Sequence, residues 1–191
     1  MADKKVTPLE FEQPLALVLQ QIELLEKQVG EGLNPELEGD LDRLNQQYDQ
    51  LKRSLYGNLR GIDHLALARH PQRPYTRDYL KRWDEHWIEM HGDRKGVDDP
   101  AMVTGLVHLG EFKVVVCGTQ KGRTIHEKKH CNFGMPQPEG YRKALRLFQH
   151  AEKFQLPVIN LIDTPGAYPG LAAEEHNQAE AIAVNLRELA G

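Results

Sequence analysis

Two narrow apolar stripes run through the first 60 residues. Between residues 11 and 29, apolar side chains recur four and three positions apart, which places them on one helix face; they are Val18, Ile22, Leu25 and Val29. The spacing returns after Asn34 and Pro35, residues typical of a helix start, and stops before Gly57; the second set is Leu37, Leu41, Leu44, Tyr48, Leu51 and Leu55. The pattern predicts an antiparallel helical hairpin. We favour pairing of the two stripes with each other, with docking onto a partner subunit as a secondary role.

Residues 62–69 favour a short helix, and the two prolines that follow, Pro71 and Pro74, force an extended segment. Thr76 is a candidate N-cap for the next helix. We expect that helix to turn one largely aromatic stripe toward the core, made of Tyr79, Trp83, Trp87 and Met90.

Strand patterns follow at residues 102–109 and 112–118, where β-branched and other apolar residues dominate. Gly110 and Glu111 fit a two-residue hairpin turn between them. Residues 114–116 are all valine, a continuous run typical of a central strand. The sequence therefore predicts an antiparallel pair with its second strand inside the sheet.

A long basic segment, residues 119–140, reads as a loop. Before Glu139 it carries four cations, Lys121, Arg123, Lys128 and Lys129, against Glu127 alone, a net charge of +3. Such a loop is equally consistent with an anion-binding role and with a mobile, solvated segment. His126 and His130 lack helical support and a third ligand, so the spacing gives no metal site.

The last third of the chain has an α/β pattern. An amphipathic helix at 139–154 is expected to bury Ala144, Leu147, Phe148 and Ala151. An apolar strand at 158–162, read as buried on both faces, and one helix at 172–190 follow. In such folds, ligands bind where a strand opens into the loop before a helix.

That loop, residues 163–170, reads Asp-Thr-Pro-Gly-Ala-Tyr-Pro-Gly. An Asp-x-x-Gly loop also serves nucleotide hydrolases, but the phosphate-cradling GxxxxGK[ST] that they require is missing from the sequence. A second hypothesis is an oxyanion hole, with backbone N–H groups of Gly166 and Ala167 as donors. An isolated motif of this kind is more often a plain turn.

Composition narrows the function classes. The net charge is −4, which argues against bulk nucleic-acid binding, and the two cysteines show no CxxC spacing that would indicate zinc or a disulfide framework. The first residues resemble no signal peptide, and the sequence contains no run of 18 apolar residues that could span a membrane. We therefore expect a cytoplasmic protein.

Five runs of residues match a known family, at 9–14, 69–76, 132–136, 138–147 and 162–170. They resemble the alpha subunit of the bacterial acetyl-CoA carboxylase carboxyltransferase, including its cyanobacterial members. The resemblance covers the chain from about Phe11 onward.

The resemblance implies an α/β fold, namely a partial crotonase-like ββα spiral after an N-terminal α-helical hairpin. It implies carboxyl transfer from carboxybiotin, held on a carrier protein, to acetyl-CoA, giving malonyl-CoA for fatty acid biosynthesis. No cofactor is expected to be bound covalently, and zinc is expected only in the beta subunit. The implied partners are that beta subunit in an α2β2 assembly, the biotin carboxyl carrier protein and biotin carboxylase.

The implied site residues lie in two segments. Gly166 and Ala167 correspond to backbone donors that hold an anion on the biotin side. Lys121, Arg123, Tyr168 and Gly170 are the expected substrate-binding residues.

Family members continue beyond the length seen here, so we expect a truncated chain whose isolated activity is lost. Residues 1–60 are expected to form the hairpin, and residues 61–191 the first part of the carboxyltransferase domain. The alternative function is that of a non-catalytic assembly or regulatory fragment that binds the beta subunit.

Overall fold

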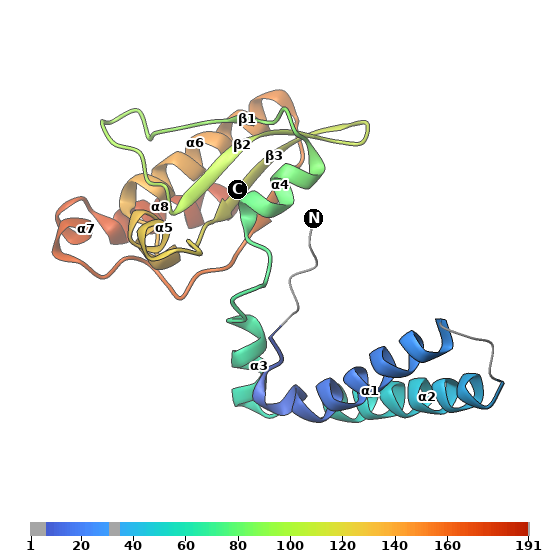
Figure 1. Ribbon diagram of the computed structural model, residues 1–191. Helices are drawn as coiled ribbons and strands as arrows, with labels where there is room; N and C mark the ends of the chain where they lie inside the picture. The colour runs from blue at the N-terminus through green and yellow to red at the C-terminus, as the bar shows by residue number, and fades with distance from the viewer. Residues whose placement is uncertain (1–6, 31–34, 191) are drawn as a thin grey trace. The chain divides into compact units, whose positions relative to one another are not determined.

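The computed structural model describes residues 7–30 and 35–190 (Figure 1). The chain divides into two compact units, Met1–Arg73 and Pro74–Gly191. The helix next to the predicted boundary at residue 60 belongs to the first unit. The assignment of domains to 1–60 and 61–191 stays a prediction.

The first unit is helical throughout its regular elements. A 3₁₀ turn, η1 (Glu10–Glu12), leads into α1 (Gln13–Gly30), and α2 (Pro35–Gly57) returns alongside it before α3 (Gly61–Ala68). The predicted hairpin is thus confirmed, with Pro35 at the first position of α2. Asn34, the predicted cap, lies outside the described residues.

The two stripes of the hairpin pair with each other, as favoured from the sequence. Val18 and Ile22 are buried on α1, together with Leu15. The six predicted positions of α2 are half-buried, while most positions between them are exposed. At the base of the hairpin the Tyr56 ring meets Phe11 edge-on, and its hydroxyl donates to Glu12. Internal packing therefore uses the predicted faces, but it encloses only a thin core.

The second unit is built on a four-stranded sheet of order β1 (Ile88–Glu89), β2 (Met102–Leu109), β3 (Phe112–Thr119), β4 (Val158–Leu161). The first two pairings are antiparallel, and β3 pairs with β4 in parallel. Leu109 lies opposite Phe112, so the predicted two-residue hairpin turn is confirmed. Helix α6 (Pro138–Phe154) makes the crossover from β3 to β4, because parallel neighbours need a long connection.

Helices cover both faces of this sheet (Figure 1). Val114 and Val116 pack with Leu80 of α4 (Thr76–Trp83), whereas Val115 packs with Leu147 of α6. The alternation of a strand sends successive side chains to opposite faces, and here both faces are apolar. The predicted central strand is therefore confirmed, as is the predicted ββα order of the elements.

Helix α4 is shorter than the sequence indicated. It ends at Trp83, because Asp84 takes an extended conformation and the chain turns into the edge strand β1. The aromatic stripe is wrong as a helix face, although Trp83 and Trp87 both pack against the core.

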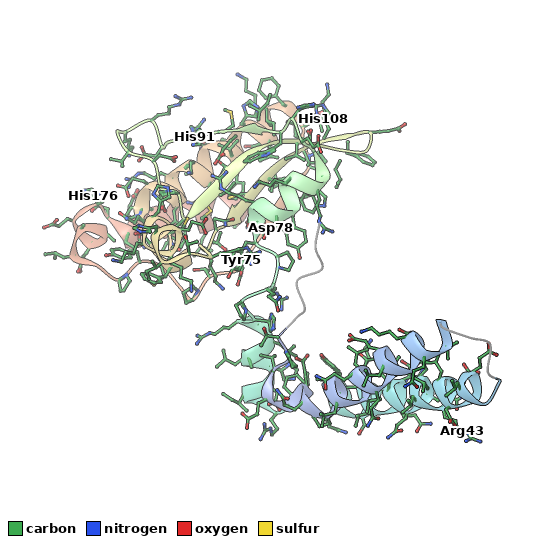
Figure 2. The ribbon with its side chains drawn as sticks, viewed as in Figure 1. Arg43, Tyr75, Asp78, His91, His108 and His176 are labelled. Atoms are coloured by element: carbon green, nitrogen blue, oxygen red, sulfur yellow. The ribbon has the colours of Figure 1, made fainter. Side chains whose placement is uncertain are left out.

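Thr76 is also not the N-cap of α4. Tyr75 holds that position, and Asp78 accepts a hydrogen bond from the Tyr75 N–H (both labelled in Figure 2). The Thr76 hydroxyl donates instead to the carbonyl of Thr119, at 2.7 Å. The threonine thereby ties α4 to the end of β3.

Strand β4 was predicted to be buried on both faces, and this is wrong. It is the last strand of the described sheet, so Val158 is 44% exposed and Ile162, just after it, 77%. The single helix predicted for residues 172–190 is also wrong. It is interrupted by Asn177, whose φ of +64° breaks it into α7 (Leu171–Glu175) and α8 (Gln178–Ala190).

No helix among residues 7–30 and 35–190 is long and apolar enough to cross a bilayer.

Candidate functional site

The loop after β4, residues 163–170, is held by hydrogen bonds to residues of the 119–137 segment. The Asp163 N–H donates to Thr119 Oγ1 at 2.7 Å, and the Asp163 carboxylate accepts from Lys121 Nζ at 2.5 Å. Further along, the Tyr168 N–H donates to the carbonyl of Pro136 at 3.0 Å. All three partners lie between residues 119 and 137. The structure therefore brings together the two segments singled out from the sequence.

Gly166 has a φ of +148°, a conformation that residues with a Cβ rarely adopt. Its N–H donates to Thr164 Oγ1 at 3.1 Å, so the local turn already uses one of the two predicted donors. The Ala167 N–H, by contrast, has no acceptor among the described residues. Of the two backbone donors predicted at this loop, Ala167 is the one available to a ligand.

Tyr168 and Gly170 close the loop. The ring of Tyr168 lies so near Gly170 that a Cβ there would collide with it. Both residues line a hollow of about 550 Å³ together with residues of α7 and α8, among them Glu174 and Gln178. Tyr168 and Gly170 are thus placed beside a concave surface, while their contact with substrate stays a prediction.

The basic segment is not the structureless loop that the sequence indicated. It contains α5 (Ile125–His130) and a 3₁₀ turn, η2 (Asn132–Gly134). Thr124 caps α5 because its hydroxyl oxygen accepts from the Glu127 N–H, and the Glu127 carboxylate in turn accepts from the Thr124 N–H. The Thr-x-x-Glu spacing of this capping box was the signal that could have predicted the helix.

Lys121 and Arg123, the predicted substrate-binding cations, each have a carboxylate partner. Lys121 pairs with Asp163 as described, and Arg123 pairs with Asp78 at 2.5 Å. The Arg123 guanidinium also lies 4.5 Å from the centre of the Tyr75 ring. The two cations therefore bind different parts of the protein and do not converge on one anion.

Helix α5 carries the remaining positive charge of the segment. Lys128 and Lys129 are exposed in its last turn, where cations interact favourably with the helix dipole. No carboxylate in the part of the chain that the structure describes pairs with either ammonium group. His126 and His130 do lie on a helix, contrary to the expectation, yet the described residues contain no cluster of three metal-ligating side chains.

Sequence reasoning missed an ionic network at the start of α6. Arg142 pairs with Asp93 at 2.8 Å and with Glu139 at 3.0 Å, and it donates to the carbonyl of His176. His176, labelled in Figure 2 between α7 and α8, also bonds Glu139 through its ring at 2.7 Å. The network ties the end of α7 to α6 and so supports the far end of the loop. Residues so distant in sequence gave no pattern to detect.

Next to it, Lys143 is almost fully buried and is held by Asp98 at 2.5 Å and by the carbonyl of Asp99 at 2.8 Å. Burial raises the pKa of Asp98, but hydrogen bonds from Lys143, Gly92 and His91 outweigh it and lower the pKa to about 2. Burial raises the pKa of Asp99. These contacts fix the segment before β2 against α6.

Neither cysteine supplies a nucleophile. Both are free, and burial raises the pKa of Cys117 to about 12 and also raises that of Cys131. Protonated, buried thiols are unreactive. The chemistry that the loop offers is therefore that of main-chain hydrogen-bond donors.

A parallel β–α–β unit that ends in such a loop defines an α/β protein with its ligand site at the carboxyl end of a strand. Comparison with known families assigns the chain more specifically than its fold does. The model of the family described as acetyl co-enzyme A carboxylase carboxyltransferase-like matches residues 8–191. The chain belongs to this family, and the match covers the whole second unit and the first unit from residue 8 onward.

Curated relatives agree with this assignment. Three of them bear the name acetyl-coenzyme A carboxylase carboxyl transferase subunit alpha. The protein from Tolumonas auensis is 52% identical over 94% of this chain, that from Azotobacter vinelandii 50% over 95%, and that from Synechocystis sp. 46% over 98%. The chain spans about 57% of the length of each of these relatives.

Among solved structures, the beta subunit of geranyl-CoA carboxylase from P. aeruginosa aligns over 96% of this chain and 30% of its own length, at 19% identity. The TM-score is 0.37, which is too low to support an argument about the fold. The fold assignment rests on the strand order and the family.

Proposed function

We propose that this chain acts in the alpha subunit of acetyl-CoA carboxylase's carboxyltransferase and helps to transfer a carboxyl group from carboxybiotin to acetyl-CoA. The names of its relatives support this proposal, as does a loop whose free main-chain donor suits an anion. Carboxybiotin loses CO2, and the ureido group of biotin takes a proton from the acetyl methyl group. The resulting thioester enolate attacks CO2 and gives malonyl-CoA.

Each anion formed in these reaction steps needs hydrogen-bond donors that are in place before the charge develops. We assign the Ala167 N–H to the ureido anion of biotin, because that donor has no acceptor among the described residues and follows a glycine with an unusual backbone conformation. Proton transfer occurs between the two substrates, so no side-chain base is required. The partners in this proposal are a beta subunit in an α2β2 assembly, the biotin carboxyl carrier protein and biotin carboxylase, with zinc held by the beta subunit.

The test is Gly166→Val in the full-length gene product assembled with the beta subunit. No atom lies within 4 Å of a Cβ built at Gly166, so the substitution acts through the backbone angle rather than through a collision. Turnover should fall about 100-fold, the loss typical of one displaced oxyanion donor.

Gly96→Val is the matched control. Gly96 has a φ of +149° and equally open surroundings, but it lies in the loop before β2. It should suffer the same backbone strain and keep its turnover. Equal activity of the two variants would show that the Gly166 loop is a plain turn.

We propose further that the anion-binding role expected of Lys121 and Arg123 belongs to Lys128 and Lys129. Lys121 and Arg123 already pair with carboxylates, whereas Lys128 and Lys129 are exposed and pair with no carboxylate of residues 7–30 or 35–190. Replacing both lysines of α5 by alanine should raise KM for either acetyl-CoA or the carrier protein, more strongly at low salt. The substrate whose KM changes identifies the anion, and unchanged kinetics at every ionic strength would leave α5 as a solvated helix.

A further inference from the structure

The hydroxyl of Thr164 contacts both ends of the same glycine. It lies 3.1 Å from the Gly166 nitrogen and 2.9 Å from the Gly166 oxygen. It also lies 2.5 Å from the carbonyl oxygen of Gly134 in η2. A hydroxyl has one proton to donate and two lone pairs to accept with. The proton is shared between the carbonyl oxygens of Gly134 and Gly166 in a three-centre hydrogen bond, while the hydroxyl oxygen accepts the Gly166 N–H.

This arrangement fixes the next peptide as well. The Gly166 carbonyl and the Ala167 N–H belong to one planar peptide, and no peptide bond among the described residues is cis. In a trans peptide the N–H points opposite to the carbonyl. Because the Gly166 oxygen is held at Thr164, the Ala167 N–H is directed away from it and finds no acceptor within the described residues.

Thr164 is anchored on the side away from Gly166. Gly134, whose carbonyl receives the hydroxyl proton, is buried, and it belongs to the segment that binds the loop again through Pro136. Asp163, the neighbour of Thr164, is fixed by Thr119 and Lys121. The hydroxyl therefore connects Gly166, a glycine at positive φ, to the buried Gly134 of η2.

We propose that Thr164 is a positioning residue for carboxyl transfer: its hydroxyl sets the Gly166–Ala167 peptide so that the Ala167 N–H meets the anion on the biotin side. This inference rests on the proposed function for the identity of the anion. It differs from the sequence-based expectation, in which Gly166 and Ala167 both donate. Here Gly166 donates to the protein, and only Ala167 donates to the ligand.

The experiment compares Thr164→Val with Thr164→Ser in the full-length complex. Valine keeps the shape of the side chain and removes the hydroxyl, whereas serine keeps the hydroxyl and removes the methyl group. Thr164→Val should lower kcat about 100-fold, the typical loss from misplacing a reacting group by about 1 Å, with KM for acetyl-CoA unchanged. Thr164→Ser should restore turnover close to that of the wild type.

Thr104→Val is the matched control for stability. Thr104 also donates a hydroxyl proton to a carbonyl, that of Met90 at 2.6 Å, but it lies on β2 outside the loop. It should destabilise the protein and leave kcat unchanged. Normal turnover in Thr164→Val, or equal losses in Thr164→Val and Thr164→Ser, would overturn the positioning role.

A second measurement needs no activity. Amide hydrogen exchange of Gly166, followed by NMR in the chain itself, should accelerate about tenfold in Thr164→Val and remain slow in Thr164→Ser. Unchanged exchange in Thr164→Val would refute the hydrogen bond on which the inference depends. If the wild-type complex transfers no carboxyl group, the proposed function fails, and this exchange measurement still decides whether Thr164 holds the Gly166 peptide.

Discussion

The two units of this chain stabilise themselves in different ways. In the hairpin of α1 and α2, apolar stripes meet along one seam, and large residues such as Leu17 and Leu24 remain more than 60% exposed. In the second unit the sheet is covered on both faces, and Val115, Val116 and Leu147 are completely buried. The hairpin is a local structure that periodicity alone specifies. The α/β unit depends on contacts between residues far apart in sequence, and the candidate site is built from such contacts.

Replacing Lys143, the buried cation of the second unit, should lower the stability of that unit strongly. Lys143→Met removes one of the three hydrogen-bond donors of Asp98, whose side chain is 36% exposed, and takes the Lys143 ammonium from the carbonyl of Asp99, which together should cost about 3 kcal/mol. Urea denaturation at neutral pH measures the loss. The exposed Lys153, on the same helix, is the control, and Lys153→Met should change stability little.

The loss of stability in Lys143→Met should also depend on pH. The pKa of Asp98 is lowered from its usual 3.8 to about 2 in the folded protein, so its ionisation stabilises the fold above pH 4. That stabilisation is lost as the pH falls from about 4 toward 2. The stability difference between wild type and Lys143→Met should therefore shrink over this range. A constant difference would show that Lys143 acts through packing alone.

Matched leucine truncations test the two cores directly. Leu147→Ala opens a cavity between α6 and the sheet and should cost about 3 kcal/mol. Leu24→Ala removes a side chain that is 62% exposed on α1 and should cost less than about 0.5 kcal/mol. Similar losses for both would mean that the hairpin buries Leu24 against a partner in solution, and the contrast between the units would then not hold.

The sequence predicted those elements whose pattern is local. The helical hairpin, the β2–β3 turn and the inward face of α6 all followed from spacing. It failed where tertiary pairing decides the outcome. Trp87 continues a helical stripe, yet pairing of β1 with β2 draws the chain out of the helix after Trp83. Strand β4 has the composition of a central strand, but in this structure it is the edge.

The sequence predicted a loop at the candidate site but not the contacts that hold this loop in place. The loop that begins at Asp163 followed from the Pro and Gly residues of the sequence. No pattern could show that Lys121 would pair with Asp163, 42 residues away, or that Thr164 would take up the Gly166 N–H. The charges of the basic segment also could not show that Lys121 and Arg123 would pair with Asp163 and Asp78, and their contact with substrate stays a prediction.

The smallest effect concerns the link between α4 and the site. Thr76→Val removes one buried hydrogen bond, that from the Thr76 hydroxyl to the Thr119 carbonyl, and should cost about 1 kcal/mol. Thr119 also holds the Asp163 N–H through its own hydroxyl, so the variant should accelerate amide exchange at Asp163 as well as lower stability. Thr76→Ser keeps the hydroxyl and should preserve the slow exchange. If Thr76→Val loses stability while Asp163 exchanges at the wild-type rate, then α4 supports the core but not the loop. The site would then depend only on the 119–137 segment and α6.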